Sequence, residues 1–340
     1  MHKRMWFIVY GLGVSSAALM LFIVGCQSTP ESVASPGRQT LVLYSFSVQE
    51  EVLSDEVLPA FSSNWTRQTG EKVIYRGVFT GSEQIAQAIL DGAPADVAIL
   101  SNEQHAVWLR INDWVKTDWQ SFPHAGIVSK SPIVIVVRPG NPQGIQDWAD
   151  LGRPGVQLVH ADPRTSGGAQ WAILAEYGSA FLDNGDPEAA EAQLKGIWAN
   201  VVSSPESSRE ALRQFLFGTG DALVTYEQDA LLARSRGASI EIVMPPSTIM
   251  TEHVAVIVDR NVTVGERAMV QAFIDFLWSE DIQTKLTRYY FRAVVDDALN
   301  QAVPEFSAIA RPFTVLDLGG WGQVYPEIIR GIWEERIASG

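Results

Sequence analysis

The sequence predicts an α/β fold of two domains, built on parallel sheets with helices on both faces. Buried-strand runs alternate with helix-like segments from Thr40 to Asp259, an order that is typical of parallel sheets. A chain of 340 residues of which 46% are hydrophobic can also bury a sizeable core, and its length favours two domains.

The strands are predicted from short runs of aliphatic and β-branched residues, which favour extended backbone in a sheet interior. These runs are residues 40–46, 72–78, 95–100, 132–138, 155–160, 221–226, 240–245 and 253–259. The segments between them include the helix-like residues 49–64, 83–90 and 169–177, and a helical stretch follows the last strand to the C-terminus. We find no internal repeat in this order.

The N-terminus has the pattern of an export signal. Basic residues 2–4 precede the uncharged stretch 6–24, and Cys26 is the only cysteine of the chain. Residues 23–26 resemble the lipobox of bacterial lipoproteins, which implies cleavage before Cys26 and acylation of its thiol. We therefore expect a signal peptide at 1–25 and a Ser- and Pro-rich tether at 26–38. A single-pass anchor with an incidental cysteine is the alternative.

Charge and composition exclude several classes of partner. The formal net charge of −14 and the pI of about 4.8 argue against nucleic acid and against an anionic membrane surface as a binding partner. The five histidines are scattered, with no pair at ligand spacing, so we predict no zinc site. We expect no cofactor.

The stretch "PRTSGGAQW", residues 163–171, lies between a predicted strand and a predicted helix. The first turn of a helix has N–H groups without intrahelical partners and carries partial positive charge. Gly167 and Gly168 would let an anion approach those N–H groups closely, and Ser166 could add a hydroxyl donor. The competing interpretation is a serine N-cap without a ligand.

Two further strand–turn–helix junctions have the same pattern. Ser47 is predicted as an N-cap after the first strand, although Glu50 three residues later also fits a capping box. Ser82 follows Gly81 at the start of the helix that ends near residue 90. Because such junctions gather at the carboxyl edge of parallel sheets, their coincidence favours an anion site.

These motifs carry a resemblance to a known family. The stretches "SNWTRQTG", "ADVAIL", "IVIVVRPGNPQGIQDWADL", "PRTSGGAQW", "GDALVTYEQDALLA", "RYYFRAV" and "LGGW" occur in order between about residues 40 and 321. The chain thereby resembles the periplasmic sulfate- and thiosulfate-binding proteins of ABC importers. The resemblance implies a two-lobed type II periplasmic-binding-protein fold, in which each lobe is a mostly parallel sheet flanked by helices and the lobes are joined by a hinge.

The resemblance also implies a domain division and partners. Lobe 1 would comprise 39–136 and 254–340, and lobe 2 would comprise 137–253, with crossovers near 133–137 and 252–256. The protein would capture sulfate or thiosulfate between the lobes and deliver it to the permease subunits of an ABC importer. We expect a monomer in the periplasm or at the cell surface, held at the membrane by the lipid on Cys26.

By position, the resemblance implies a ligand set made of neutral donors. The residues carried over are Ser47, Ser82, Ser166, Gly167, Gly168 and Tyr226, with Ser207 a weaker candidate beside Ser208. Tyr226 stands where the family has an indole, and a phenol donates from a different place. Glu50 and Glu51 stand where the family has an arginine, and "SSPESSREAL" (203–212) matches the family poorly. These departures leave molybdate, phosphate or another oxyanion open.

Two other chemistries remain as alternatives. Adjacent Tyr289 and Tyr290 are the pattern by which iron-binding relatives of the fold hold ferric ion. Ser166 with a histidine and an acid could form a hydrolytic triad, but "TSGGA" lacks the glycine spacing of a nucleophile elbow. Asp96 and Asp162 could form an acid/base pair. We predict a binding protein and not an enzyme.

Overall fold

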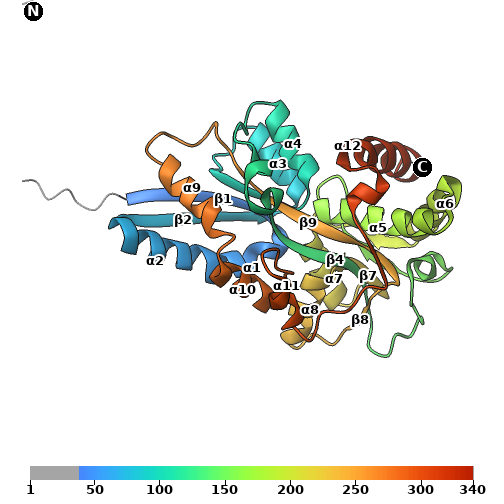
Figure 1. Ribbon diagram of the computed structural model, residues 1–340. Helices are drawn as coiled ribbons and strands as arrows, with labels where there is room; N and C mark the ends of the chain where they lie inside the picture. Colours follow the sequence, from blue (N-terminus) through green and yellow to red (C-terminus); the bar gives the residue numbers. More distant parts are fainter. Residues whose placement is uncertain (1–37, 340) are drawn as a thin grey trace, which may run out of the picture. The chain divides into compact units, whose positions relative to one another are not determined.

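The computed structural model describes residues 38–339 (Figure 1). The predicted signal peptide, Cys26 and nearly all of the tether lie outside the described residues. Arg38, the last residue assigned to the tether, is already the first residue of strand β1.

Ten strands form one mixed sheet with the order β2-β1-β3-β9-β4-β7-β5-β6, in which β10 also pairs with β9 and β8 with β4. Their bounds are β1 Arg38–Phe46, β2 Lys72–Thr80, β3 Val97–Leu100, β4 Ile127–Val137, β5 Leu158–His160, β6 Val201–Ser203, β7 Ala222–Tyr226, β8 Glu241–Val243, β9 Ser247–Ile257 and β10 Arg311–Phe313. Six of these strands overlap the predicted runs closely, namely β1, β2, β3, β5, β7 and β8. β4 and β9 begin earlier than predicted, and the short strands β6 and β10 were not predicted.

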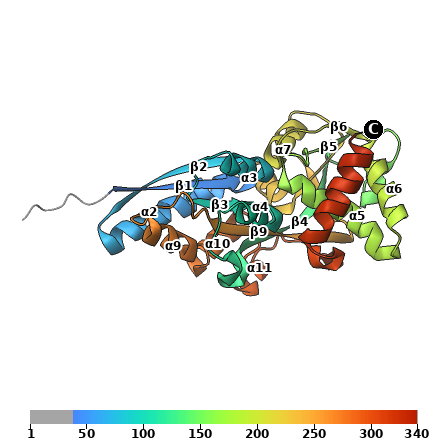
Figure 2. The same ribbon diagram turned by 90° about the horizontal axis from the view of Figure 1, so that it is seen from above.

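The long strands β4 and β9 connect two groups of strands. β9 pairs with β3 at residues 254–257 and with β4 at 250–254, whereas β4 continues beyond this pairing to contact β7 and β8 at 133–137. We call β2, β1 and β3 the first strand group and β7, β5 and β6 the second. Figures 1 and 2 show these groups at opposite ends of β4 and β9.

The prediction of parallel sheets holds within each strand group and fails where the groups join. β1 is parallel to both β2 and β3, and β5 is parallel to both β6 and β7. β9 is antiparallel to β3, and β4 is antiparallel to β7, β8 and β9. The antiparallel pairs arise because β4 and β9 run between the groups instead of returning through a helical crossover.

The helices lie on both faces of the sheet. The main ones are α2 Leu58–Thr69, α3 Ser82–Leu90, α4 Glu103–Ile111, α5 Gly167–Asn184, α6 Pro187–Trp198, α7 Ser208–Leu216, α8 Glu227–Ser235, α9 Arg267–Phe276 and α10 Glu280–Arg288. Shorter elements are η1 Ser47–Gln49, α1 Glu50–Val52, η2 Leu53–Val57, η3 Trp119–Ser121, η4 Pro123–Gly126, η5 Trp148–Gly152, α11 Asp297–Gln301, η6 Val315–Leu318, α12 Trp321–Val324 and η7 Tyr325–Ile337.

Alternation of buried side chains along each strand fixes which helices cover which face. In β3, Val97 and Ile99 belong to the core that includes Phe61 of α2, whereas Ala98 and Leu100 pack in a separate cluster with α3 and α4. Likewise, Ile133 and Ile135 of β4 share a cluster with α5 and α6, while residues 134 and 136 face α7 and α8. Each strand group is therefore a layer between two layers of helices.

The C-terminal helices contact elements of both strand groups. The ring of Tyr325 lies 5.0 Å from that of Trp108 in α4, and the ring of Trp333 lies 5.0 Å from that of Trp198 in α6. Between residues 38 and 339, no helix is both long and apolar enough to cross a lipid bilayer.

Candidate functional site

The predicted binding residues lie where strands end and helices begin. η1 follows β1, α3 follows β2, α5 follows β5 after a short loop, α7 follows β6, and α8 follows β7. Strands of one parallel group end at the same edge of the sheet, and the carboxyl edge is where open α/β folds bind ligands. The start of α3 is hydrogen-bonded to the loop before α5, so the carboxyl edges of the two strand groups face each other.

The start of α5 carries the clearest set of unused donors. Ser166 is the N-cap, and its Oγ accepts a hydrogen bond from the Ala169 N–H at 3.3 Å. The next two residues, Gly167 and Gly168, are buried, and their N–H groups have no acceptor among the described residues. Buried N–H groups without a partner are rare in proteins. The serine cap and the anion cradle, weighed as alternatives from the sequence, are thus compatible in one structure.

Both glycines are required by close neighbours. A Cβ atom at Gly167 would lie 2.2 Å from Ser101 Oγ, and a Cβ atom at Gly168 would lie 2.3 Å from Ser208 Oγ and 2.9 Å from Tyr226 Oη. These distances show that hydroxyl groups from three different strand ends surround the first turn of α5. Glycine at both positions leaves room for these hydroxyl groups beside the backbone.

The start of α3 is joined to the loop before α5. The N–H groups of Glu83 and Gln84 donate to the Thr165 carbonyl at 3.1 and 3.3 Å. Gly81 is needed here because a Cβ atom would lie 2.2 Å from the same carbonyl oxygen. The Ser82 N–H has no acceptor among the described residues, and Ser82 is only 1% exposed.

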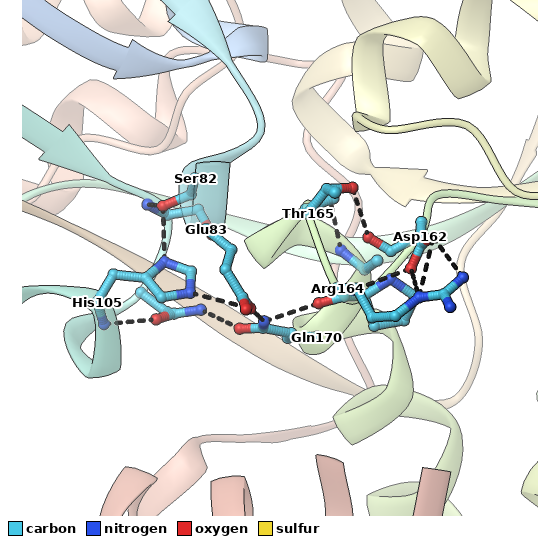
Figure 3. Close-up of polar contacts among 12 residues, drawn as sticks. Ser82, Glu83, His105, Asp162, Arg164, Thr165 and Gln170 are labelled. Carbon is cyan, nitrogen blue, oxygen red and sulfur yellow. Dashed lines mark hydrogen bonds and ion pairs between the residues drawn. The ribbon is translucent and has the colours of Figure 1, made fainter. Parts of the chain in front are cut away.

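Ser82 and His105 form a buried pair at the edge of this region (Figure 3). Ser82 Oγ accepts from the Ser101 N–H at 2.9 Å and lies 2.8 Å from His105 Nδ1. Burial lowers the pKa of His105, so the ring is neutral and carries one proton. His105 Nε2 lies 3.8 Å from a Glu83 carboxylate oxygen, which favours the proton on Nε2. Nδ1 then accepts from the Ser82 hydroxyl, and Ser82 has its N–H left for a ligand.

Gln170 links the two strand groups through its side-chain amide. Its Oε1 accepts from Asn102 Nδ2 at 2.9 Å, and its Nε2 donates to the Pro163 carbonyl at 2.9 Å and to the Glu83 carboxylate. Figure 3 shows Gln170 between Glu83 and the loop that carries Thr165. The side chains therefore hold the two carboxyl edges together.

Two buried hydroxyl groups lie near α5, and only one of them was predicted from the sequence. Ser101 Oγ and Tyr226 Oη are buried and make no hydrogen bond within residues 38–339. Tyr226 is 1% exposed, and burial raises the pKa of its phenol, so it stays protonated and able to donate. Tyr226 was predicted as a ligand residue. Ser101 was missed, because a single serine after a strand gives no pattern.

The start of α7 presents Ser208 and not Ser207. Ser207 is the N-cap, with its Oγ accepting from the Glu210 N–H at 3.2 Å, so its hydroxyl is turned into its own helix. Ser208 Oγ lies 3.4 Å from Ser166 Oγ, and the Ser208 N–H has no acceptor among the described residues. Ser207 therefore caps α7, and the adjacent serine faces the start of α5.

Ser47 differs from its predicted position. β1 ends at Phe46, as predicted, where it pairs with Thr80 of β2, but the helical turn begins at Ser47 itself, one residue earlier than an N-cap at Ser47 implies. Phe46 is the N-cap of η1, Ser47 is the first helical residue, and the predicted capping box with Glu50 does not form. Ser47 is buried, and its hydroxyl has no hydrogen-bond partner within the described part of the chain.

An ionic cluster joins the two strand groups beside the starts of η1 and α7. The Glu51 carboxylate accepts from Arg209 at 2.7 Å and from Arg236 at 3.0 Å. Arg209 also lies 2.9 Å from the fully buried carboxylate of Asp229, whose pKa is raised to about 6 by burial against the opposing effect of Arg209. Glu51 stands where the family has an arginine. Here it pairs with two arginines from the helical region of the second strand group.

The geometry contradicts the hydrolase alternative. Ser166 has no histidine partner, since its Oγ contacts Ser208 and the Ala169 N–H. The two acids considered as a pair have separate partners, because Asp96 accepts from the Val42 N–H and Asp162 pairs with Arg164. Within residues 38–339, no three His, Cys, Asp or Glu side chains lie together as a metal site requires.

The fold and the buried N–H and hydroxyl donors at the helix starts indicate the class of this protein. The chain belongs to the bacterial extracellular solute-binding proteins, whose family profile matches residues 55–292. This membership confirms the prediction of a binding protein and not an enzyme. The fold is that of the type II periplasmic binding proteins. A periplasmic thiamin-binding protein with 14% identity has the same fold, with a TM-score of 0.66 over 86% of this chain and 96% of that chain.

Within that class, the predicted resemblance to the sulfate- and thiosulfate-binding proteins is confirmed. The chain is similar to the sulfate-binding protein of Synechococcus elongatus, with 32% identity over 95% of this chain and 93% of the relative. It is also similar to the thiosulfate-binding protein of Pseudomonas aeruginosa, with 30% identity over 86% and 89% of the two chains. The solved structure of the sulfate-binding protein SubI from Mycobacterium tuberculosis has 31% identity and a TM-score of 0.77, and the match covers 85% of this chain and 99% of that chain.

Proposed function

We propose that this protein is the extracytoplasmic receptor of an ABC importer and that it captures sulfate or thiosulfate at the start of α5. The family membership and the two groups of similar proteins support the class of ligand. The observation that supports this location is a set of buried N–H groups that find no acceptor in the described part of the chain, those of Ser82, Gly167, Gly168 and Ser208. They belong to the starts of α3, α5 and α7, which follow strands of both strand groups.

A fully ionised tetrahedral anion is the ligand that such donors fit. Among residues 38–339, no carboxylate oxygen is hydrogen-bonded to the residues of this set or to Ser101, Ser166 and Tyr226. Hydrogen phosphate needs an acceptor for its own proton, whereas sulfate needs donors only. Convergent N–H dipoles stabilise the charge without a cationic side chain, which agrees with the acidic character of the whole chain.

The proposed ligand set takes Ser208 instead of Ser207 from the weak pair of candidates, keeps the other residues predicted from the sequence, and adds Ser101. Ser82, Gly167, Gly168 and Ser208 would donate through the backbone. Ser166 and Tyr226 would contribute hydroxyl groups, as would Ser101. Ser47 stays in the proposal as a residue at the start of η1, close to where Arg209 donates to the Val48 carbonyl at 3.3 Å. Ser207 is retained only as the residue that caps α7.

The two-lobed hinge is part of the same proposal. Lobe 1 would comprise 39–136 and 254–340 and lobe 2 would comprise 137–253, with the crossovers in β4 and β9. The C-terminal helices would have to slide or separate on opening, because Tyr325 packs on lobe 1 and Trp333 packs on lobe 2. The closed protein would dock on the permease, held near it by the acylated Cys26.

Calorimetric titration of the purified protein with sulfate, thiosulfate, molybdate and phosphate tests the proposal. We expect binding of sulfate or thiosulfate and much weaker binding of phosphate at neutral pH, by about tenfold or more, because an unmet proton or acceptor clash costs about 1–3 kcal/mol. A preference for phosphate, or no heat with any of the four ions, would refute the ligand assignment.

A further inference from the structure

Ser101 is held by both strand groups at once. Its N–H donates to Ser82 Oγ at 2.9 Å, and its carbonyl accepts from the Trp171 indole at 2.6 Å. Both backbone groups are therefore used, and the residue is fully buried. Its hydroxyl alone has no hydrogen-bond partner within residues 38–339. A fixed backbone gives this hydroxyl a fixed position before any ligand arrives.

Tyr226 holds a second unpaired hydroxyl next to the first. Its ring packs 6.0 Å from that of Phe46 and 5.5 Å from that of His253, which fixes the direction of the phenol. The nearby Ser101 hydroxyl partly offsets the rise in the pKa of Tyr226 that burial causes, so the two groups are neighbours. Neither makes a hydrogen bond of good geometry to the other.

The two hydroxyls lie against consecutive glycines whose N–H groups are also free. Ser101 Oγ is 2.2 Å from the Cβ position of Gly167, and Tyr226 Oη is 2.9 Å from that of Gly168. Buried hydroxyl groups are nearly always paired in native proteins. Two unpaired hydroxyls at the same helix start, each with a proton to donate, indicate an acceptor that sits between them when the site is filled.

We propose that Ser101 Oγ and Tyr226 Oη donate together to one oxygen of the bound anion, and that this hydroxyl pair makes the site prefer sulfate over thiosulfate. The inference rests on the proposed function and adds the residues that set its selectivity. Thiosulfate has a sulfur atom in place of one oxygen, and sulfur is a weak hydrogen-bond acceptor. The two hydroxyl donors, one from each strand group, therefore favour an oxygen atom over a sulfur atom at the position between them.

Titration of Ser101→Ala, Tyr226→Phe and the double variant with sulfate and with thiosulfate tests this inference. We expect each single variant to bind sulfate about tenfold more weakly, while thiosulfate binding falls by less than about threefold, so that the preference for sulfate narrows. Because both hydroxyls share one acceptor, the double variant should lose less than the product of the two single losses. The ratio of the two affinities is measured within one variant, so a loss of stability does not change it.

Matched controls remove a hydroxyl of the same type elsewhere. Ser62→Ala loses the Oγ that donates to the Val73 carbonyl on the far side of β2, and Tyr75→Phe changes an exposed phenol. Both should keep the affinities of the unchanged protein. An equal loss for sulfate and thiosulfate in Ser101→Ala, or no loss for either, would overturn the hydroxyl pair while leaving the receptor assignment intact. An unchanged protein that binds neither ion would overturn both.

Discussion

Replacing Gly168 by alanine should damage anion binding more than deleting the hydroxyl of Ser166. The added Cβ would lie 2.3 Å from Ser208 Oγ and 2.8 Å from Tyr226 Cε2. Since carbon atoms in contact are about 3.5–4.0 Å apart, the Ser208 hydroxyl must retreat by about 1 Å and the Tyr226 ring by somewhat less. The ring is packed on Phe46 and His253 and cannot move freely.

The magnitude follows from the number of donors displaced. The added Cβ would displace the Tyr226 hydroxyl and the start of α7 that carries the Ser208 N–H. Hydrogen bonds to a charged group are each worth about 1.5–3 kcal/mol, so Gly168→Ala should weaken sulfate binding by about 100-fold or more. The steric misfit should also lower the free energy of unfolding by about 1–3 kcal/mol. Ser166→Ala removes one hydroxyl and the cap of α5, so we expect a loss of about tenfold to 100-fold in affinity and about 1 kcal/mol in stability.

Calorimetry at fixed ionic strength measures the affinities, and denaturant unfolding measures the stabilities. Gly196→Ala is the control, because Gly196 is in α6 and its added Cβ would approach no atom closer than 3.9 Å. It should leave sulfate binding unchanged and should raise stability by about 0.5–1 kcal/mol, as expected for an alanine in a helix. Equal or tighter sulfate binding by Gly168→Ala than by Ser166→Ala would refute the close approach of the backbone to the anion.

Three further predictions concern the ion cluster, the hinge and the anchor. Burial raises the folded-state pKa of Asp229 from 3.8 to about 6. The folded protein therefore loses stability as pH rises through that range, because the buried carboxyl group must ionise. Relative to the unchanged protein, Asp229→Asn should gain stability between about pH 4 and pH 7, by on the order of 2–3 kcal/mol. Unfolding curves that show a constant difference across this range would contradict the shift. X-ray scattering should show a smaller radius of gyration with saturating sulfate than without it, and identical curves would remove the hinge. Cys26→Ala should abolish fatty-acid labelling and leave the precursor uncleaved, and labelling that persists would rule out the lipoprotein assignment.

Most of the strands could be predicted from the sequence because each is a compact run of aliphatic residues between polar turns. The antiparallel pairing of β4 with β7 and β9 could not, since strand direction depends on which strands meet across a long separation in sequence. The end of the first strand at Phe46 was predicted, but the role of Phe46 as N-cap was missed. Phe46 has no side-chain oxygen that could cap a helix and a serine follows it, so the local pattern favoured Ser47 as the N-cap.

The candidate site was predictable where glycines mark a close approach. Gly167 and Gly168 follow a serine at the start of a helix, and that local pattern predicts an anion site made of backbone N–H groups. Ser101 had no such pattern, and Ser208 was only a weak candidate beside Ser207 in a segment that matches the family poorly. Their hydroxyls matter because tertiary packing brings a strand end from each group to the same two glycines, and a single serine in a sequence carries no sign of that meeting.

The Thr165 carbonyl that receives two N–H groups of α3 has a consequence for transport. These hydrogen bonds run from proposed lobe 1 to proposed lobe 2, so closing gives the helix a partner that belongs to the protein itself. If the lobes open as proposed, water must satisfy those groups, and the empty receptor can regain them by closing alone. Some receptors would then close without cargo and compete for the permease. The importer would have to tell a full receptor from a closed empty one by how long each remains shut, since their outer surfaces would match.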